Sequence, residues 1–342
     1  YTGSYAQRGQ AGIVRYRLDT ATGEMTAQGV YCGVQNPSYV ALNADASILY
    51  AVEETVPEGK LHALRATLQG LVPVASLSTE GGDPCHISLT DGERMLLVSN
   101  YASGSLAMYA LDTRGLPLAM QALCRHAGHS VHPTRQASAH VHYAQAWGTY
   151  IFVADLGLDR VLCYDVPKQG ELLQDCGLWL QLPPGSGPRH LAFGPEGSDT
   201  AYVVCELSNQ VAVYRKPWTQ SGAPVQMVST LPLGTGGASI AAAIHRQGKW
   251  LFVSNRGHDS IALYRIQRDG TLSLLQIEPT GGQTPRDFAV MGEWLIVANQ
   301  DSQTITLLHW DAANERLRFT GRSMEAIKPT CVCPVPSSGL SR

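Results

Sequence analysis

The sequence has 342 residues, of which 44% are hydrophobic and 15% are charged, and its formal net charge is −3. These values are typical of a folded globular protein. They exclude a basic surface field of the kind that binds nucleic acid, and no apolar run approaches the roughly 18 residues that a membrane span needs. We therefore expect neither a nucleic acid nor a membrane as a partner.

The 34 glycines and 19 prolines indicate many short elements joined by tight turns. The eight cysteines are spread along the chain, and several, such as Cys163, fall inside strand-like runs. Buried free thiols are the expected role for such cysteines. Cys331 and Cys333 share one face of a strand, but no second pair completes a zinc site. Unpaired thiols favour a reducing, cytoplasmic compartment.

A short apolar segment that ends in a polar residue recurs along the whole chain. In chain order, these strand-end residues are Ser4, Glu53, Asn100, Asp155, Glu206, Asn255 and Asn299. The intervals between them are 49, 47, 55, 51, 49 and 44 residues. A nearly fixed period in this range indicates a repeat architecture, in which each repeat is one supersecondary unit.

The third repeat shows the internal order of the unit. A first strand is predicted to begin at Pro84, a second at Met95, and the third and fourth to cover 106–109 and 121–124. Such short runs between turn signals are strands, and no segment has a helical period with caps. The chain is therefore predicted to be an all-β, seven-bladed β-propeller of four-stranded antiparallel blades, with 1–342 as a single domain.

The two ends of the chain are predicted to share one blade. Residues 328–332 resemble the first strand of a blade, as in 36–40, whereas residues 1–5 resemble a second strand. Pairing of the N-terminal and C-terminal strands would close the ring.

The longest interval, from Asn100 to Asp155, contains an additional segment at 125–136 that is rich in histidine and arginine. Insertions in repeat folds map to loops, often on the binding face. We therefore expect this loop to contribute to a binding site.

Histidines open three of the predicted first strands, at His86, His142 and His190. A lone histidine is more often a surface residue or a satisfied core residue than a functional one. First strands line the central channel of a propeller, so one residue type at the same place in three blades predicts that all three rings face one channel.

Four arginines are expected near the same channel mouth. They are Arg135 in the inserted loop, Arg189 and Arg286 in first strands, and Arg256 after a second strand. An exposed arginine is usually a solvated charge, but four at one mouth would form a strongly cationic cup. Guanidinium groups bind carboxylate and phosphate bidentately, so a small anionic molecule is the predicted ligand.

Glu206 stands in the column of strand-end residues, in which only Glu53 is also a glutamate. The amides of this column are expected to hydrogen-bond the next blade; they are Asn100, Asn255 and Asn299. A carboxylate among cations could instead orient a histidine or act as a general base on water. Nearby positive charge would lower its pKa and burial would raise it.

A metal site is an alternative use of the histidines. His140 and His142 lie on one strand face, and His126, His129 and His132 lie nearby in the sequence. No carboxylate or cysteine stands beside them at ligand spacing, so neither a metal nor another cofactor is predicted. The sequence also lacks a G-x-S-x-G elbow and a P-loop.

Seven segments, in order and in phase with the repeat, resemble the seven-bladed β-propeller lactonases, a family that includes bacterial 6-phosphogluconolactonases and a fungal carboxymuconate cyclase. The segments are 84–88, 100–105, 135–136 with 140–142, 155–160, 187–190, 206–209 and 255–260. The resemblance extends from Tyr1 to about Cys331, which is nearly the whole chain. Each motif alone is weak, but seven in order are specific to the family.

The resemblance to the cyclase implies a catalytic set of one histidine, two arginines and one glutamate on the channel. By position these are His142, Arg189, Glu206 and Arg256. The implied reaction is hydrolysis of a sugar-acid lactone, in which water attacks the ring carbonyl and the ring oxygen leaves. Either Glu206 or His142 would act as the base. Arg189 or Arg256 would stabilise the oxyanion, with about 3 kcal/mol per donor.

A second set of residues is predicted to hold a phosphate or carboxylate of the substrate. These residues are His86, Arg135, His140, His190, Arg286 and Asp287. The chain departs from the family in the first strand at 239–244, where family members often carry an acidic residue and this chain has alanines. The channel is therefore expected to be more cationic than in those relatives.

Three functions remain open from the sequence. The favoured one is hydrolysis of 6-phosphogluconolactone to 6-phosphogluconate, a step of the pentose phosphate pathway, and the second is a lactonising cyclase or isomerase acting on an unsaturated diacid. The third is a non-catalytic propeller that binds proteins, because a fold does not determine a function. A scaffold would spread aromatic and apolar residues over its top face, whereas this chain places histidine and arginine there. A monomer or weak homodimer is expected.

Overall fold

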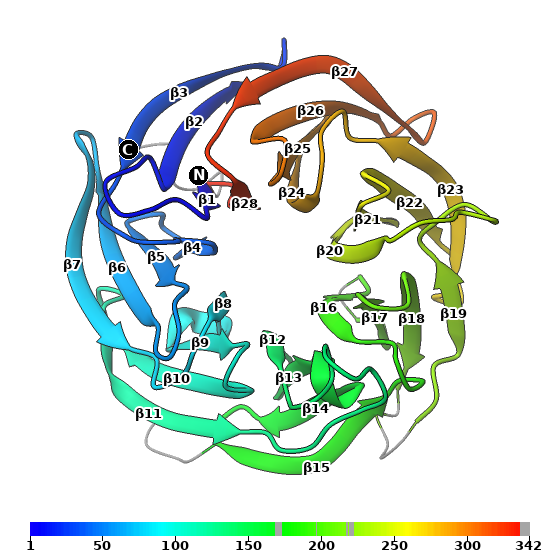
Figure 1. Cartoon of the computed structure of the whole chain (residues 1–342), viewed down its shortest axis with the longest axis horizontal. Coiled ribbons are helices and arrows are strands. Elements are labelled where there is room, and N and C mark those ends of the chain that lie inside the picture. The colour runs from blue at the N-terminus through cyan, green and yellow to red at the C-terminus, as the bar shows by residue number, and fades with distance from the viewer. Residues whose placement is uncertain (168–172, 196, 217, 219–221, 336–342) are drawn as a thin grey trace.

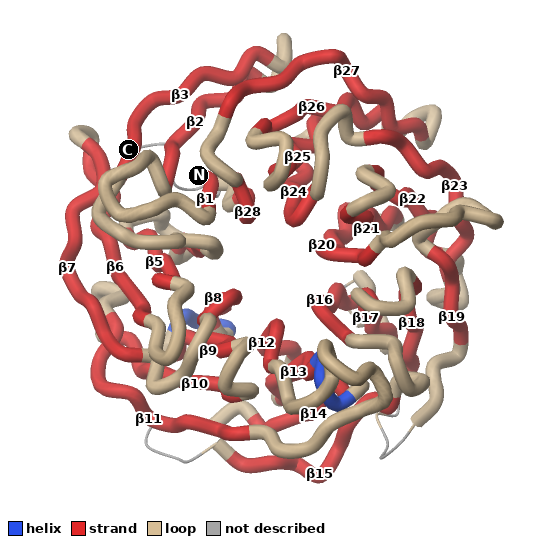
Figure 2. The backbone as a smooth tube through the Cα atoms, viewed as in Figure 1, coloured by secondary structure: helices blue, strands red, loops and turns tan. Residues whose placement is uncertain are grey.

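The computed structural model describes residues 1–167, 173–195, 197–216, 218 and 222–335. Seven four-stranded antiparallel sheets stand around a central channel, with the first strand of each sheet innermost (Figure 1). Strands form nearly all of the regular structure in this part of the chain (Figure 2), and helix is confined there to η1 (Asp91–Glu93) and η2 (Leu156–Leu158). The predicted seven-bladed β-propeller is confirmed. No helix among the described residues has the length and apolarity to span a membrane.

The blades are numbered from 1 to 7 around the ring. Blade 1 contains β28 (Pro329–Val332), β1 (Thr2–Ser4), β2 (Ile13–Asp19) and β3 (Glu24–Tyr31). Blade 2 contains β4 (Val40–Leu42), β5 (Ile48–Glu53), β6 (Lys60–Thr67) and β7 (Gly70–Ser78). Blade 3 contains β8 (Pro84–Leu89), β9 (Met95–Asn100), β10 (Ser105–Leu111) and β11 (Pro117–Arg125).

The remaining four blades follow the same order from the channel outward. Blade 4 contains β12 (Val141–Trp147), β13 (Tyr150–Asp155), β14 (Arg160–Asp165) and β15 (Gln174–Gln181). Blade 5 contains β16 (Pro188–Phe193), β17 (Thr200–Cys205), β18 (Gln210–Arg215) and β19 (Gln226–Ser229). Blade 6 contains β20 (Ile240–Gln247), β21 (Trp250–Arg256), β22 (Ser260–Ile266) and β23 (Leu272–Pro279). Blade 7 contains β24 (Pro285–Met291), β25 (Trp294–Asn299), β26 (Thr304–Asp311) and β27 (Arg316–Glu325).

The ring is closed by both ends of the chain, as predicted. β1 pairs antiparallel with β28, with Thr2 opposite Val332 and Gly3 opposite Cys331. Blade 1 therefore takes its innermost strand from the C-terminal side and its other three from the N-terminal side (Figure 1).

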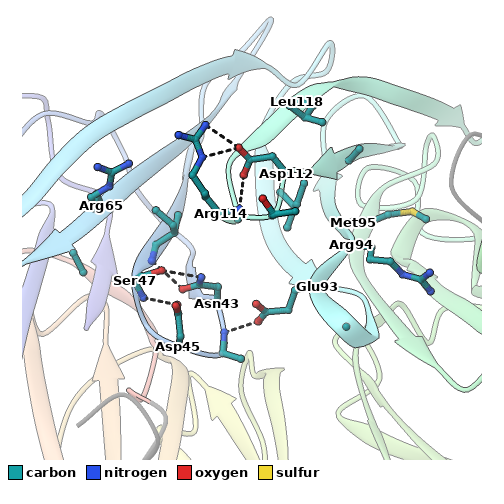
Figure 3. A pocket seen from close by; sticks show the side chains of 18 of the residues that line it. Asn43, Asp45, Ser47, Arg65, Glu93, Arg94, Met95, Asp112, Arg114 and Leu118 are labelled. Atoms are coloured by element: carbon teal, nitrogen blue, oxygen red, sulfur yellow. Dashed lines mark hydrogen bonds and ion pairs between the residues drawn. The ribbon is translucent and has the colours of Figure 1, made fainter. Parts of the chain in front are cut away.

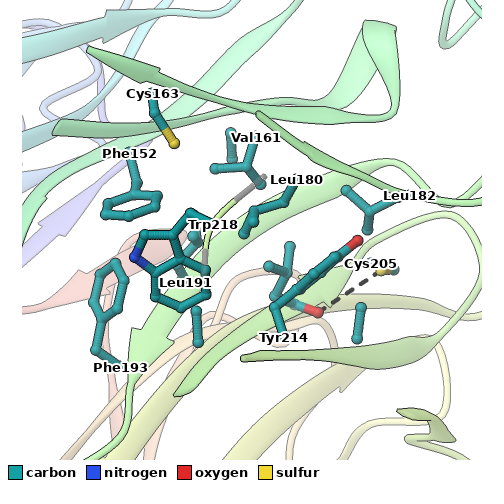
Figure 4. Close-up of a cluster of buried hydrophobic side chains, with 14 residues drawn as sticks. Phe152, Val161, Cys163, Leu180, Leu182, Leu191, Phe193, Cys205, Tyr214 and Trp218 are labelled. Atoms are coloured by element: carbon teal, nitrogen blue, oxygen red, sulfur yellow. Dashed lines mark hydrogen bonds between the residues drawn. The ribbon is translucent and has the colours of Figure 1, made fainter. Parts of the chain in front are cut away.

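The hydrophobic core lies between the blades rather than in one central mass. Second strands such as β5, β9 and β17 are buried along their whole length. Both faces of a blade pack on neighbouring blades, so these strands are continuous apolar runs, and this is the repeat visible in the sequence. Between blades 4 and 5, Phe152 contacts Phe193 and Trp218 with ring centroids 5.0 and 5.7 Å apart (Figure 4).

Most first strands share a β-bulge near the channel. In blades 3 to 7 the pairing of first and second strand shifts register close to the start of the first strand. A bulge re-aims a side chain, and bulges are frequent beside active sites. The bulge residues are Cys85, His142, Arg189, Ala242 and Arg286.

One backbone contact per blade positions the residue that follows the second strand, which we call the rim residue. In six blades its N–H donates to a carbonyl at the entry to the first strand, over 2.7 to 3.2 Å. In blade 6 the rim residue is the last residue of β21 and pairs with Ile240 of β20. The rim residues, from blade 1 to blade 7, are Tyr5, Glu54, Tyr101, Leu156, Glu206, Arg256 and Gln300. Each blade therefore offers one rim position to the channel mouth, and blades 3 to 7 also offer a bulge position.

Gly3→Ala tests the closing blade. A Cβ at Gly3 would lie 2.4 Å from the carbonyl oxygen of Pro37 in blade 2, whereas a Cβ at Gly29 in β3 would meet no atom within 4 Å. Overpacking of this kind costs about 1–3 kcal/mol. We expect calorimetry to show a lower Tm for Gly3→Ala and an unchanged or slightly higher Tm for Gly29→Ala. Equal Tm values for the two variants would contradict a tightly packed closure.

Candidate active site

The sequence analysis placed His142 at the same position as His86 and His190, and the structure shows that this is wrong. It is the bulge residue of its blade, whereas the other two histidines follow the bulge residue by one position. The offset was hidden because the blade 4 strand begins without the proline that marks the register in blades 3 and 5. The three rings nevertheless meet in the channel, with centroids 5.5 Å apart for His142 and His190 and 5.7 Å for His86 and His190.

Glu206 lies one residue beyond the strand-end column to which the sequence analysis assigned it. Cys205, and not Glu206, pairs with the proline that opens the first strand, as Asn100 does in blade 3. Glu206 is a rim residue, and its counterpart in blade 2 is Glu54 rather than Glu53. Successive residues of extended backbone point to opposite sides, so the strand-end residue faces a neighbouring blade and the rim residue faces the channel.

The amides of the strand-end column have two kinds of partner. Asn100 and Asn255 donate to backbone carbonyls of the neighbouring blade over 3.1 and 2.9 Å, as predicted. Asn299 does not, because the hydroxyl of Thr306 on the adjacent strand of its own blade accepts from its Nδ2 over 2.8 Å. These residues hold the blades and take no part in the channel mouth.

Glu206 is the buried anion of the channel, with 1% of its surface exposed. Arg256 Nη2 donates to its Oε2 over 2.6 Å, Arg189 Nε lies 3.0 Å from the same oxygen, and Arg135 Nη2 donates to Oε1. Burial raises the pKa of this carboxyl, but the charges of Arg256 and Arg189 outweigh burial and hold the pKa well below its usual range. Such a carboxylate is a weak base. Its main effect is to hold the three arginine side chains in place.

The channel histidines are buried and neutral. Burial and the charge of Arg189 hold the pKa of His142 and His190 well below the usual value and lower that of His86 to about 3. Arg189 Nη1 donates to His190 Nε2 over 3.2 Å, which makes that nitrogen an acceptor. His142 Nδ1 lies 3.8 Å from Cys85 Sγ, and among the described residues no hydrogen-bond partner reaches its Nε2.

Arg286 belongs to a second polar chain, contributed by blades 7, 1 and 2. Its Nη2 donates to Tyr5 Oη over 2.8 Å, and Tyr5 Oη donates to Glu54 Oε1 over 2.7 Å. Ser38 Oγ donates to the other carboxylate oxygen. The sequence analysis did not single out Tyr5, Glu54 or Ser38. The first two are rim residues, so the repeat itself would have identified them once its phase was known.

The inserted loop 125–136 lies at the mouth and carries Arg135 into it. Gln136 is fully buried and anchors the loop: its Nε2 donates to the Leu156 carbonyl over 2.9 Å and its Oε1 accepts from the His132 amide over 3.1 Å. Arg135 Nη2 also donates to Tyr101 Oη over 3.3 Å. A rigidly held loop thus supplies the one site arginine that does not come from a blade.

The histidines around the inserted loop serve separate purposes. His126 Nδ1 contacts an Asp155 carboxylate oxygen at 2.7 Å and its Nε2 contacts Tyr164 Oη at 2.9 Å. His140 stacks on Tyr101 with centroids 4.4 Å apart. Within the described part of the chain, no three histidine, cysteine or acidic side chains are grouped so that they could hold a metal ion.

A cavity of about 260 Å³ opens at the channel mouth. Its lining residues are Glu54, Asp83, Cys85, Tyr101, Arg135, His142, Glu206, Arg256 and Arg286. Five predicted site residues therefore meet there: Arg135, His142, Glu206, Arg256 and Arg286. The cup is less cationic than predicted, because Glu206 neutralises part of the arginine charge and two further carboxylates share the lining.

Other predicted residues lie beneath or beside this cavity. Arg189, His190 and Asp287 line a much smaller hollow of about 10 Å³. Asp287 accepts from the Val332 amide over 2.9 Å and contacts His245 at 3.0 Å, so it ties the closing strand rather than reaching the mouth. His86 and His140 are absent from both linings.

A hollow of about 1080 Å³ lies between blades 2 and 3 (Figure 3). Its walls come from turns at the opposite ends of the strands from the channel mouth, including 43–48 and 110–115. Asp112 accepts two hydrogen bonds from the Arg114 side chain, and Glu93 accepts from the Ala44 amide. Because these groups satisfy each other, the hollow is a structural junction of turns.

Comparison with known proteins agrees with this architecture. Residues 1–334 match the family model described as "Lactonase, 7-bladed beta-propeller". A 6-phosphogluconolactonase of Bacillus subtilis is 31% identical over 342 residues, with 97% of each chain covered. A periplasmic gluconolactonase of Pseudomonas aeruginosa has a TM-score of 0.88 at 30% identity, with 96% of each chain covered. A solved structure from Lactobacillus plantarum has a TM-score of 0.89 at 29% identity, covering 96% of this chain and 97% of the other.

The fold and the channel mouth define a seven-bladed β-propeller whose first strands and rim residues gather charged side chains around one cavity. The chain belongs to the seven-bladed β-propeller lactonase family. The family resemblance read from the sequence is therefore confirmed.

Glu206→Gln tests the buried charge cluster. Removing the carboxylate leaves three arginines without their counter-ion, which costs about 3–5 kcal/mol at neutral pH. The native pKa of Glu206 lies below its unfolded value of about 4.3. The advantage of the wild type is therefore complete above that value and is lost as pH falls through the native pKa. Urea unfolding at pH 7 and pH 3 measures this; an equal difference at both pH values would contradict the cluster.

Proposed function

We propose that the chain hydrolyses the lactone of a sugar acid, and that 6-phosphogluconolactone is its first candidate substrate. The observation that carries this proposal is one cavity in which a neutral His142 faces arginines that are held by Glu206. The family membership and the activity named for the Bacillus relative support the same reaction.

His142 is the better candidate for the base of the two that the sequence left open. Both oxygens of Glu206 are occupied by arginines, so neither is open to a water. His142 is unprotonated at neutral pH and has Nε2 free of protein partners in the described chain. In the proposed step, a water loses its proton to Nε2 while its oxygen attacks the lactone carbonyl carbon.

Arg256 is the better candidate for oxyanion stabilisation. It lines the cavity, whereas Arg189 lines only the smaller hollow. The Arg256 side chain is 10% exposed, against 3% for that of Arg189, so it is the more accessible of the two donors. Fixed donors aimed at a developing oxyanion contribute about 3 kcal/mol each. Glu206 would then act through the arginines that it positions.

Unphosphorylated gluconolactone is a second candidate substrate. Three of the four predicted anion-binding arginines already contact Glu206, which leaves less positive charge for a phosphate than the sequence predicted. The activity named for the Pseudomonas relative points the same way. That relative is also named periplasmic, so the cytoplasmic location of this chain stays a prediction from its thiols, all eight of which are free.

The two other functions open from the sequence have less support. A cyclase acting on a diacid would place two carboxylates in a mouth that already contains Glu54 and Asp83. A protein-binding scaffold has no need to bury Glu206 with three arginines, because buried charges are costly to desolvate.

The deciding experiment follows hydrolysis of 6-phosphogluconolactone and of gluconolactone against their spontaneous rates. We expect the wild-type chain to accelerate at least one of them and the double variant Glu206→Gln with His142→Ala to lose that acceleration. No acceleration by the wild type, or full acceleration by the double variant, would contradict the proposal.

His142→Gln tests the base. We expect kcat/KM to fall about 10²- to 10⁴-fold, the usual contribution of a positioned base. In the wild type the lowered pKa keeps the ring neutral in mild acid, so kcat/KM should stay level through the ordinary histidine pKa of about 6.5. His309→Gln, on outer strand β26, is the control and should match the wild type. A wild-type inflection near that pH would contradict the assignment.

A further inference from the structure

Two glutamates face each other in the channel mouth from equivalent places in the repeat. Glu54 and Glu206 are the rim residues of blades 2 and 5, which lie across the channel from one another (Figure 1). Both line the same cavity. The backbone N–H of each donates to a carbonyl at the entry to its first strand, over 3.2 Å for Glu54 and 2.7 Å for Glu206. The two residues differ in the side chains around them.

Those surroundings are opposite in character. Glu206 contacts three guanidinium groups. Glu54 contacts two hydroxyl groups, because Tyr5 stands between it and Arg286 and Ser38 holds its other oxygen. Within the described residues, no cationic nitrogen lies within ion-pair distance of the Glu54 carboxylate.

The surroundings of Glu54 favour the protonated form of its carboxyl group. Burial raises its pKa, and the negative charge of Asp83 raises it further. Arg286 and the hydrogen bonds from Ser38 and Tyr5 lower it, but the net shift is upward. A hydroxyl can accept as well as donate, so the contact with Ser38 is compatible with a protonated carboxyl.

We propose that Glu54 is the general acid that protonates the leaving ring oxygen of the lactone, a role that rests on the proposed lactone hydrolysis. When the tetrahedral intermediate collapses, the bond between the carbonyl carbon and the ring oxygen breaks and its electron pair passes to that oxygen. The Glu54 carboxyl gives its proton to the same oxygen, which becomes the hydroxyl of the product. The proton taken from water by His142 then restores the Glu54 carboxyl through solvent.

Glu54→Gln, assayed on two lactones with different leaving groups, tests this role. An aliphatic sugar lactone releases an alcohol that needs a proton as it leaves, whereas an aromatic lactone releases a phenol of pKa about 10, which leaves more easily as an anion. We expect kcat for the aliphatic lactone to fall about 100-fold and kcat for the aromatic lactone to be nearly unchanged. The retained aromatic activity would also show that the variant is folded.

Glu53→Gln is the matched control, because Glu53 is the adjacent glutamate but pairs with Arg8 and His62 outside the cavity. It should keep both activities. Equal losses on the two lactones in Glu54→Gln, or no loss on either, would overturn the acid role while leaving the lactonase proposal intact. A wild-type chain without activity on any lactone would overturn both.

Discussion

The pairing of β1 with β28 is the contact on which the channel mouth depends. It completes blade 1 from the two ends of the chain, and blade 1 joins blade 7 to blade 2. The polar chain from Arg286 through Tyr5 to Glu54 crosses this junction. A ring opened here would separate one wall of the cavity while leaving in place the Glu206 cluster, which comes from blades 5 and 6 and the inserted loop.

Closing seven sheets into a ring also forces charged side chains together. Bulge and rim residues converge where water is scarce, so each charge needs a partner. Glu206 meets that need for three arginines, and the remaining arginine is held through Tyr5. Because the ion pairs occupy Glu206, a neutral His142 is left as the group best able to accept a proton, and Glu54 as a group able to give one.

The errors of sequence reasoning were errors of register. His142 was aligned with His86 and His190, although it lies one position earlier in its strand. Glu206 was aligned with Asn100, although it lies one position later. The blade 4 strand begins without the proline that marks the register in blades 3 and 5. A shift of one residue moves a side chain to the other face of a strand. For the same reason the sequence analysis took Glu53 as the counterpart of Glu206, whereas the counterpart is Glu54.

The sequence by itself determined the fold, the closure of the ring and the family, because an apolar strand repeated about every 50 residues can be buried in few other ways. It also named five of the nine residues that line the mouth cavity, because histidines and arginines cluster at its strand ends, but it missed Glu54. The tertiary structure alone decided which charges pair. Distances between Arg135, Glu206 and Arg256 depend on how three separate segments converge, and these distances set the pKa values on which any chemistry here depends.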